Sequence, residues 1–144
     1  MSDMDNWEAL VETADADAET RVGYTGWVLF TVSGPELNPG SVSAILDLEP
    51  DRLIFPGSAQ EGVWQLNSHL GAEEPLEKHL WVLLERILPV RRQLRQLARD
   101  HKLEFYCSVQ KDREAEIHFE LPSRLLLLIG YLGAGIVCDV SDHY

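Results

Sequence analysis

Apolar positions in the first third of the chain follow the periods of a strand and a helix. Residues 24–32 are apolar on both alternations, which predicts a central strand covered at least partly on both faces. Asn38 suits an N-cap and Pro39 suits the first helical position. A short helix is therefore expected to begin there and to end before Pro50, which disfavours helical backbone in the residue before it.

The middle of the chain predicts two short strands and a long helix. The strands are expected over residues 53–55 and 63–66, with a reversal at residues 56–57. From Pro75 onward, leucine and isoleucine recur at i, i+4, i+7, i+8 and i+11, the pattern of a core-facing helix. Pro89 removes a backbone donor within this pattern, yet the apolar stripe resumes after it. The helix is therefore expected to be either kinked or split at Pro89.

The last third predicts two strands, a helix and a final strand. Residues 103–109 read as one strand, and residues 115–121 alternate between apolar and polar, which predicts another with its apolar side inward. Ser123 can cap a helix whose glycine-rich end leads into a strand over residues 136–140. The order favours an α+β fold: a ferredoxin-like α/β sandwich with a mostly antiparallel sheet, extended by a C-terminal β-α-β unit.

One local motif lies between the first helix and the long one. Residues 46–52 read Leu-Asp-Leu-Glu-Pro-Asp-Arg, and a glycine reversal and a tryptophan-bearing strand follow. Each part has a local physical reason, so the motif is interpreted as scaffold, with the adjacent Asp and Arg pairing to fix the turn. The residues of this structural motif are Pro50, Asp51, Arg52, Gly57 and Trp64.

This motif gives the chain a family resemblance. It resembles the bacterial domain of unknown function family numbered 4279, whose members share the Leu-Glu-Pro-Asp-Arg turn, a following glycine, a tryptophan in the next strand and a Leu/Glu-rich helix. The resemblance runs from about Gly23 to the C-terminus, and it implies a small bacterial α+β domain without a particular activity. Where the family usually has an aromatic, a basic residue and Gly-Asp after the Arg, this chain reads Leu-Ile-Phe-Pro-Gly-Ser at residues 53–58.

Length and charge restrict the domain organisation and the class of partner. A chain of 144 residues fits one domain, and 24 Asp and Glu against 12 Lys and Arg give a net charge of −12. This balance argues against nucleic acid and suits a basic protein partner, although it also serves solubility alone. Residues 1–20 carry acidic residues and no Lys or Arg. They are expected to form an acidic, flexible N-terminal segment before a single domain over residues 21–144.

The sequence does not predict a membrane association. The longest apolar run, residues 125–137, is too short to span a bilayer, and residues 1–20 lack the basic start and apolar run of a secretory signal. Cys107 and Cys138 occur in apolar strand contexts and are interpreted as buried free thiols. The expected location is the cytoplasm.

No sequence motif for catalysis or metal binding occurs. Nucleophile-elbow, Walker, dinucleotide and zinc spacings are all missing, so no catalytic residue, metal ligand or cofactor is assigned. The five histidines are scattered and are interpreted as surface residues. His79 and Glu77 would form an acid/base pair only if the fold placed them in a pocket. Trp64 is interpreted as a core or edge aromatic, and a groove shared with Trp27 is left open.

Four arginines form a basic ridge after Pro89 on an otherwise acidic chain. Three of them recur every four residues, which places them on one helix face. The ridge is interpreted as a solvated face or, alternatively, as an anchor for an acidic ligand or for the acidic N-terminal segment. The basic ridge consists of Arg91, Arg92, Arg95 and Arg99.

Function is predicted only at the level of class. The first hypothesis is a non-enzymatic, cytoplasmic bacterial binding domain of the immunity or antitoxin type, because negative charge speeds the capture of a basic protein. The alternative is a small-molecule-binding sensor domain, by fold analogy, and an enzyme comes third. The chain is expected to be a monomer or a homodimer. The residues expected to meet a basic partner are Glu73, Glu74, Asp112, Glu114 and Glu116.

Overall fold

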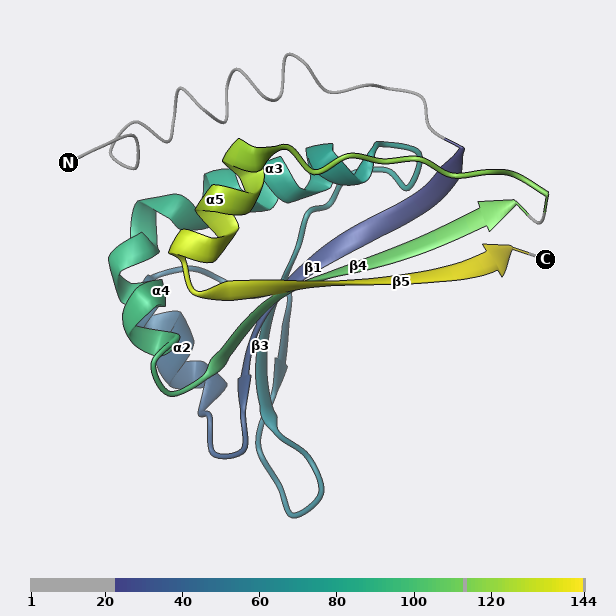
Figure 1. Ribbon diagram of the computed structural model, residues 1–144. Helices are drawn as coiled ribbons and strands as arrows, with labels where there is room; N and C mark the ends of the chain where they lie inside the picture. Colours follow the sequence, from purple (N-terminus) through teal and green to yellow (C-terminus); the bar gives the residue numbers. More distant parts are fainter. Residues whose placement is uncertain (1–22, 113, 144) are drawn as a thin grey trace.

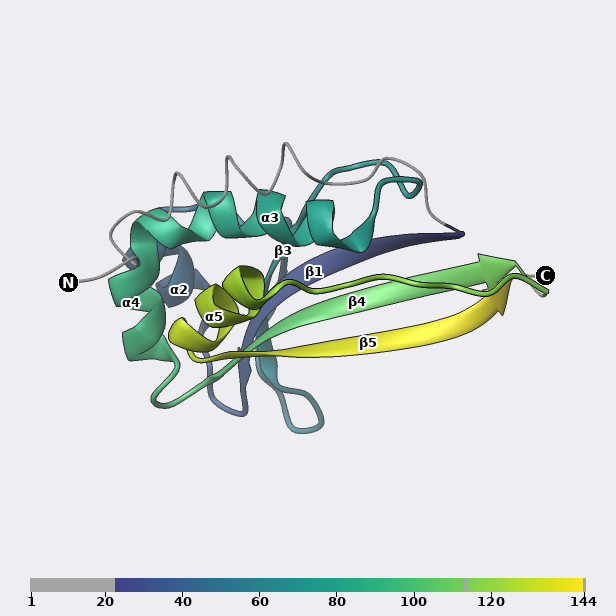
Figure 2. The same ribbon diagram turned by 45° about the horizontal axis from the view of Figure 1, so that its top comes forward.

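A five-stranded sheet carries all the labelled helices on one of its faces (Figures 1 and 2). The computed structural model describes residues 23–112 and 114–143, so the expectations for residues 1–20 lie outside the described part of the chain. In chain order the elements are β1 (Tyr24–Gly34), α2 (Pro39–Leu46), β2 (Arg52–Ile54), β3 (Gly62–Asn67), α3 (Leu76–Ile87), the 3-10 turn η2 (Leu88–Val90), α4 (Arg91–Leu97), β4 (Lys102–Asp112), α5 (Ser123–Tyr131) and β5 (Ala134–His143).

The strands are ordered β2-β3-β1-β4-β5 across the sheet. β1 pairs antiparallel with both β3 and β4, and β2 pairs antiparallel with β3. β4 and β5 are parallel. Parallel neighbours need a crossover connection, and α5 lies within it. The predicted mixed α+β class is therefore confirmed.

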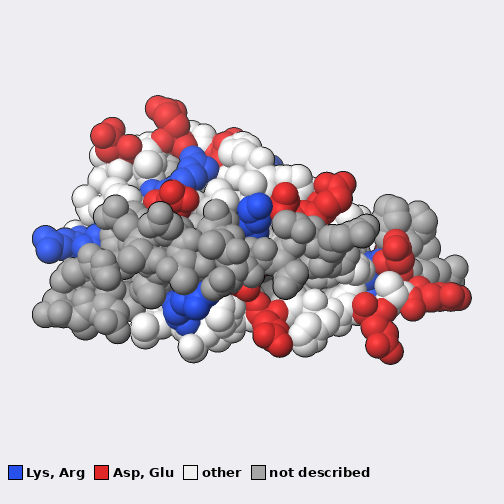
Figure 3. Space-filling model, turned by 90° about the horizontal axis from the view of Figure 1, so that it is seen from above, with Lys and Arg blue, Asp and Glu red and all other residues white. Residues whose placement is uncertain are grey.

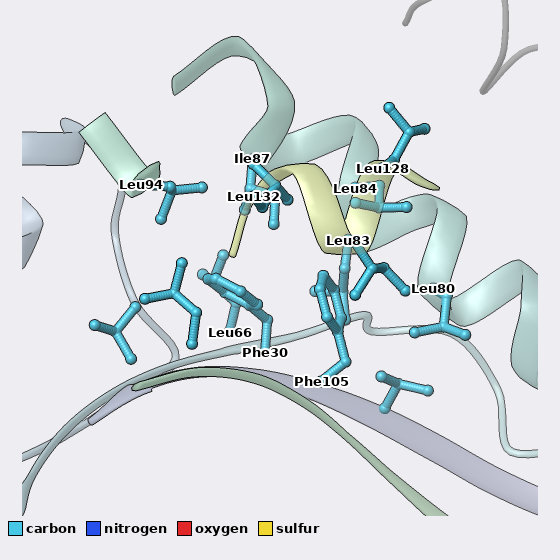
Figure 4. Close-up of a cluster of buried hydrophobic side chains, with 14 of the residues drawn as sticks. Phe30, Leu66, Leu80, Leu83, Leu84, Ile87, Leu94, Phe105, Leu128 and Leu132 are labelled. Atoms are coloured by element: carbon cyan, nitrogen blue, oxygen red, sulfur yellow. The ribbon is translucent and has the colours of Figure 1, made fainter. Parts of the chain in front are cut away.

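The core lies between the helices and one face of the sheet (Figure 4). Val28, Phe30 and Val32 of β1 are fully buried there, and the rings of Phe30 and Phe105 lie 5.0 Å apart between centroids. The helices supply the other side of the core with the apolar stripes that the sequence predicts. Buried side chains labelled on this side are Leu80, Leu83, Leu84, Ile87, Leu94 and Leu128.

The opposite face of the sheet carries the second apolar alternation of β1. Trp27 and Leu29 point to this face and are half-buried, whereas their neighbours in β1 are buried under the helices. Leu29 lies opposite Tyr106 of β4 in the strand register. The predicted central strand is confirmed, and only one of its two faces is fully covered by described residues.

The helix predicted from Pro75 is split at Pro89. α3 ends at Ile87, and η2 contains Pro89 before α4 begins at Arg91. Because proline lacks a backbone N–H, a 3-10 turn accommodates it where an α-helix would lose a hydrogen bond. Leu88 stays buried, so the apolar stripe continues across the break.

The strand predicted over residues 115–121 is wrong. This segment is extended but belongs to no strand, and it runs along the helical side of the sheet into α5 (Figure 2). The prediction that the apolar side chains of this segment face the core is confirmed. Phe119 packs against the core, and its ring meets that of Tyr24 edge-on, with 5.9 Å between the centroids. A strand needs a free neighbouring edge, and β4 is already paired on both sides, with β1 and β5.

Candidate functional site

Three arginines of the basic ridge line a cavity of about 550 Å³ between α4 and the turn from α5 into β5. We call this cavity the arginine groove. Arg92, Arg95 and Arg99 are spaced three and four residues apart, so they project from one face of α4 and the turn that follows it. Leu94 projects into the core and fixes this helix against the sheet. The complete lining is Arg92, Arg95, Gln96, Ala98, Arg99, Gly130, Tyr131, Leu132 and Gly133.

The opposite wall of the arginine groove depends on a tight turn. Gly133 has φ +82°, a left-handed conformation that side chains with a Cβ rarely adopt. A Cβ at this position would lie 2.9 Å from the Cβ of Ala98. The glycine therefore lets the α5–β5 turn approach α4 closely enough to close one side of the groove.

The groove is positive, although the protein is acidic overall. None of its lining residues is Asp or Glu, and Arg92, Arg95 and Arg99 form no ion pair with any residue described in the structure. Arg95 lies over the Tyr131 ring, with its guanidinium carbon 4.5 Å from the ring centroid. Guanidinium groups bind carboxylates and phosphates through paired N–H donors, so the groove is suited to an anion.

The fourth arginine of the ridge has a different role. Arg91 donates from Nη1 to the carbonyl oxygen of Leu88 over 3.1 Å and does not line the groove. This bond ties the start of α4 to the 3-10 turn that precedes it. The predicted four-residue ridge is therefore three groove residues and one residue bonded to the backbone.

The predicted partner-binding carboxylates gather at the far end of the sheet. The backbone N–H of Gly26 donates to the carbonyl of Ala72 over 2.9 Å, which places the loop before α3 beside the start of β1. The end of β4 flanks the same part of β1, since Tyr24 lies opposite Lys111. On the face seen in Figure 3, one group of acidic side chains lies at this end, and further acidic side chains lie elsewhere on the face, among the Lys and Arg. We call Glu73, Glu74, Asp112, Glu114 and Glu116 the acidic end.

The residues of the acidic end differ in their solvent exposure and ion pairing. Glu73 and Glu114 are exposed, whereas Glu74 is half-buried and its carboxylate lies 3.4 Å from the ammonium of Lys78. Asp112 and Glu116 are also exposed. These four exposed residues are therefore better positions than Glu74 for testing contact with a partner, and Glu73 and Glu114 represent the two segments of the acidic end.

The structural motif holds the first helix and a loop to the sheet. Trp64 is fully buried and donates from Nε1 to the hydroxyl of Ser43 in α2 over 3.0 Å. In the strand register Trp64 lies opposite Val32, on the helical face, whereas Trp27 lies on the open face. The two tryptophans therefore line no common groove. Gly57 follows β2 and forms an isolated bridge with Gln60 in the loop before β3.

The predicted pairing of Asp51 with Arg52 is wrong. Asp51 accepts a hydrogen bond from the backbone N–H of Asn67 over 2.7 Å, and its other oxygen lies 2.7 Å from Nε2 of His69. Successive side chains near a strand point to opposite sides, which separates Asp51 from its neighbour. The carboxylate thus joins the turn after Pro50 to the end of β3.

His79 is buried, contrary to the prediction of a surface histidine. It is 0% exposed, and its Nδ1 lies 2.6 Å from the hydroxyl of Ser68. Burial lowers the pKa of the His79 ring below the ordinary 6.5, against opposing contributions from Gly71 and Glu74. Its position in the stripe, between Leu76 and Leu80, is the signal in the sequence that predicts burial.

The Ser68–His79 pair has the residue types of a nucleophile and a base, but it does not form a site. Ser68 is 4% exposed, and neither residue lines the arginine groove. His79 is also not paired with Glu77, which accepts a hydrogen bond from Nε1 of Trp81 over 3.0 Å. The pair fixes the loop after β3 to α3, so we interpret it as structural.

The two cysteines lie in different environments. Cys107 is buried as predicted, and burial, with Cys138 beside it, raises the pKa of its thiol. Cys138 is exposed, because β5 is the edge of the sheet and has a neighbouring strand on one side only. The prediction of two buried thiols is therefore wrong for Cys138.

Neither a metal-binding cluster nor a membrane-spanning helix occurs among the described residues. No three His, Cys, Asp or Glu side chains within residues 23–112 and 114–143 are grouped so that they could hold a metal ion. None of the helices in that part of the chain is long and apolar enough to cross a bilayer.

Comparison with known proteins assigns a family. The model of the family described as "Domain of unknown function (DUF4279)" matches residues 20–143. No curated protein and no solved structure matches the chain. The match covers β1 through β5, including the motif around Asp51 and both walls of the arginine groove. The chain therefore belongs to the DUF4279 family.

Proposed function

We propose that this domain is a non-catalytic binding domain that takes an acidic ligand in the arginine groove. The single observation that supports this function is the convergence of three guanidinium groups on one cavity without a carboxylate in its lining. Three cations that form no ion pair with described residues repel each other, and an anion bound among them removes that repulsion.

The size and lining of the groove favour a small ligand with several acidic groups. Its volume of about 550 Å³ lies within the usual range for small-molecule sites, roughly 300–1,000 Å³. Arg92 and Arg99 supply charge, while the half-buried Tyr131 supplies apolar surface. A polycarboxylate or an organic phosphate satisfies both requirements, which corresponds to the sensor alternative.

Calorimetric titration of the full chain tests the proposal with three probes: citrate, inorganic pyrophosphate and, as a neutral control, glucose. Citrate or pyrophosphate should bind, and Arg92→Gln with Arg99→Gln should weaken binding by about tenfold or more, because each charged hydrogen bond contributes about 1.5–3 kcal/mol. Arg52→Gln is the matched control, since Arg52 is exposed on β2 and outside the groove. If neither anion binds, or if the double variant binds as well as the wild type, the proposal is wrong.

The acidic N-terminal segment is an alternative occupant within the same chain. A variant that begins at Arg21 separates the two cases. If residues 1–20 occupy the groove, this variant should bind citrate more tightly than the full chain, because an intramolecular competitor has been removed. Equal affinity of the two chains would assign the groove to an external ligand.

A second candidate function is capture of a basic protein, as in the immunity or antitoxin type. The observation that favours it is the gathering of five predicted contact carboxylates at one end of the sheet. A partner recovered by affinity purification should then associate more slowly as salt is raised. The double variant Glu73→Lys with Glu114→Lys should also slow association. An association rate that changes neither with salt nor with this double variant would exclude this function.

We also infer the finer description of the fold and its location. The antiparallel order β2-β3-β1-β4 supports a ferredoxin-like arrangement. The parallel pairing of β5 supports a C-terminal β-α-β unit that starts from β4 rather than from residues 115–121. The two free thiols, one of them exposed, support a cytoplasmic location. The bacterial origin that the family resemblance implies stays a proposal.

A further inference from the structure

Among the described residues, β5 is an edge strand of the sheet along its whole length. Its ten residues pair with β4 on one side, and no other described strand lies on the other side (Figure 1). Unpaired backbone N–H and C=O groups on such an edge are a template for another strand. The opposite edge of the sheet, β2, has only three residues. β5 therefore offers a much longer edge than β2 for pairing with another strand.

β5 lacks the features that usually protect an edge from pairing. It contains no Lys, Arg or Pro. Its two carboxylates are engaged with β4: Asp139 accepts a hydrogen bond from the Tyr106 hydroxyl, and Asp142 lies 3.2 Å from the ammonium of Lys111. The charges on β5 are thus held within their own sheet.

Exposed apolar side chains are concentrated beside this edge. Four of the seven large apolar side chains that are exposed among the described residues belong to α5 and β5: Leu126, Leu127, Val137 and Val140. In the register with β4, Val137 lies opposite Tyr106 on the open face and Val140 lies opposite Val109 on the helical face. A strand placed along β5 would therefore cover apolar side chains on both faces of the sheet.

We propose that β5 pairs antiparallel with β5 of a second copy of this chain, around a twofold axis at Cys138. In this register the whole of residues 134–142 is paired, and residues opposite each other share a face of the sheet. Ile136 lies opposite Val140 of the partner, and Asp139 lies opposite the partner's Val137. No two carboxylates of β5 face each other.

The charge distribution of the molecule favours this occupant. β5 begins directly after Gly133 of the arginine groove and ends beside Lys111, near the acidic end. An antiparallel pair places the end of one β5 next to the start of the other. Each acidic end therefore lies toward the arginine groove of the partner, and the two acidic ends lie apart.

Sedimentation of the full chain over a concentration series tests the pairing. The wild type should show a monomer–dimer equilibrium, and Val137→Lys with Val140→Lys should weaken it by about tenfold or more, because each lysine enters the twofold interface twice. Both positions are exposed, so the fold should survive, and thermal melting checks this. Ile45→Lys on α2 is the matched control, since Ile45 is 47% exposed and Val140 is 49% exposed.

Cross-linking at Cys138 tests the register. A short bis-maleimide should link two chains through Cys138, whereas buried Cys107 should not react. Cys138→Ser should abolish the link and leave the dimer intact. A wild type that sediments as a monomer at all concentrations, a dimer that is unaffected by the double lysine variant, or a dimer without a Cys138 link would overturn the proposal.

Discussion

The arginine groove and the acidic end carry opposite charges on different kinds of structural support. In the arginine groove, Arg92, Arg95 and Arg99 project from a helical segment that Leu94 fixes in the core, and a glycine turn closes the facing wall. At the acidic end, the carboxylates lie in the loop before α3 and beyond the end of β4, mostly exposed.

This difference in support separates two electrostatic roles. Charges on a fixed helix face around a cavity can select a ligand by geometry, because their positions are set before binding. Exposed carboxylates on loops create a field that acts on the rate of encounter and is screened by salt. We therefore expect core substitutions to abolish the proposed anion binding in the arginine groove, and surface substitutions at the acidic end to change only the rate of the proposed binding to a partner.

The largest expected effect is that of Leu94→Ala. The substitution leaves a cavity under α4 and should lower the free energy of unfolding by about 2–5 kcal/mol. Urea denaturation measures the change, and citrate binding should weaken in parallel because the arginines lose their fixed support. Leu53→Ala is the control, since Leu53 is 40% exposed on β2, and it should cost far less. A small effect of Leu94→Ala would show that the groove does not depend on the core.

Gly133→Ala should have the next largest effect. A Cβ at φ +82° is strained and would lie 2.9 Å from the Cβ of Ala98, so we expect a loss of about 1–2 kcal/mol from the backbone conformation alone. The α5–β5 turn should also move away from α4 and weaken anion binding. Gly135→Ala is the matched control, because its Cβ would meet no atom within 4 Å. Equal stability of the two variants would contradict the role given to the turn.

The sequence predicts local elements here better than it predicts the contacts between them. The α3 stripe and the cap at Asn38 are fixed by neighbours in sequence, and Asn38 does accept from the N–H of Gly40 over 2.9 Å. The four-residue spacing predicts a common face for Arg91, Arg95 and Arg99, but Arg92 rather than Arg91 lines the groove with the other two. Tyr131 and Gly133, which complete the groove, are distant in sequence and come from another element, so no local pattern connects them to α4.

The errors have physical causes of the same kind. Alternation over residues 115–121 predicts which side chains face the core, but a strand also needs a free edge, and that depends on where β5 lies. His79 is polar, which favours a surface position, whereas its place in the apolar stripe favours burial. Ser68 offers the ring a hydrogen-bonding partner within the core, and that contact is visible only in three dimensions.

The pH dependence of the free energy of unfolding should report on His79, which fixes the loop after β3 to α3. Because the folded protein lowers the pKa of His79 below 6.5, the unfolded chain binds the proton more strongly. The free energy of unfolding should be constant above about pH 6.5 for this group and should decrease as the pH falls below it, by at most about 1.4 kcal/mol per pH unit. His79→Asn should reduce that slope, as measured by urea denaturation between pH 7.5 and 5.5.

His118→Asn provides the control for this measurement. His118 is exposed, and its Nε2 lies 3.2 Å from a carboxylate oxygen of Glu120. This variant measures how much the loss of an exposed histidine changes the slope, and His79→Asn should change it more. If His79→Asn changes the slope no more than this control does, another group is responsible for the acid sensitivity.

The smallest effect on stability is expected from Glu73→Lys with Glu114→Lys. Both side chains are exposed in segments outside the core, so the free energy of unfolding should change by no more than about 0.5 kcal/mol. The variant should nevertheless bind citrate in the arginine groove slightly faster at low salt, because a less acidic protein repels an anion less, and this gain should vanish at high salt. Denaturation and stopped-flow binding measure the two quantities on the same samples. A large loss of stability would mean that the acidic end belongs to the packed structure, and the division between a rigid site and a steering surface would then fail.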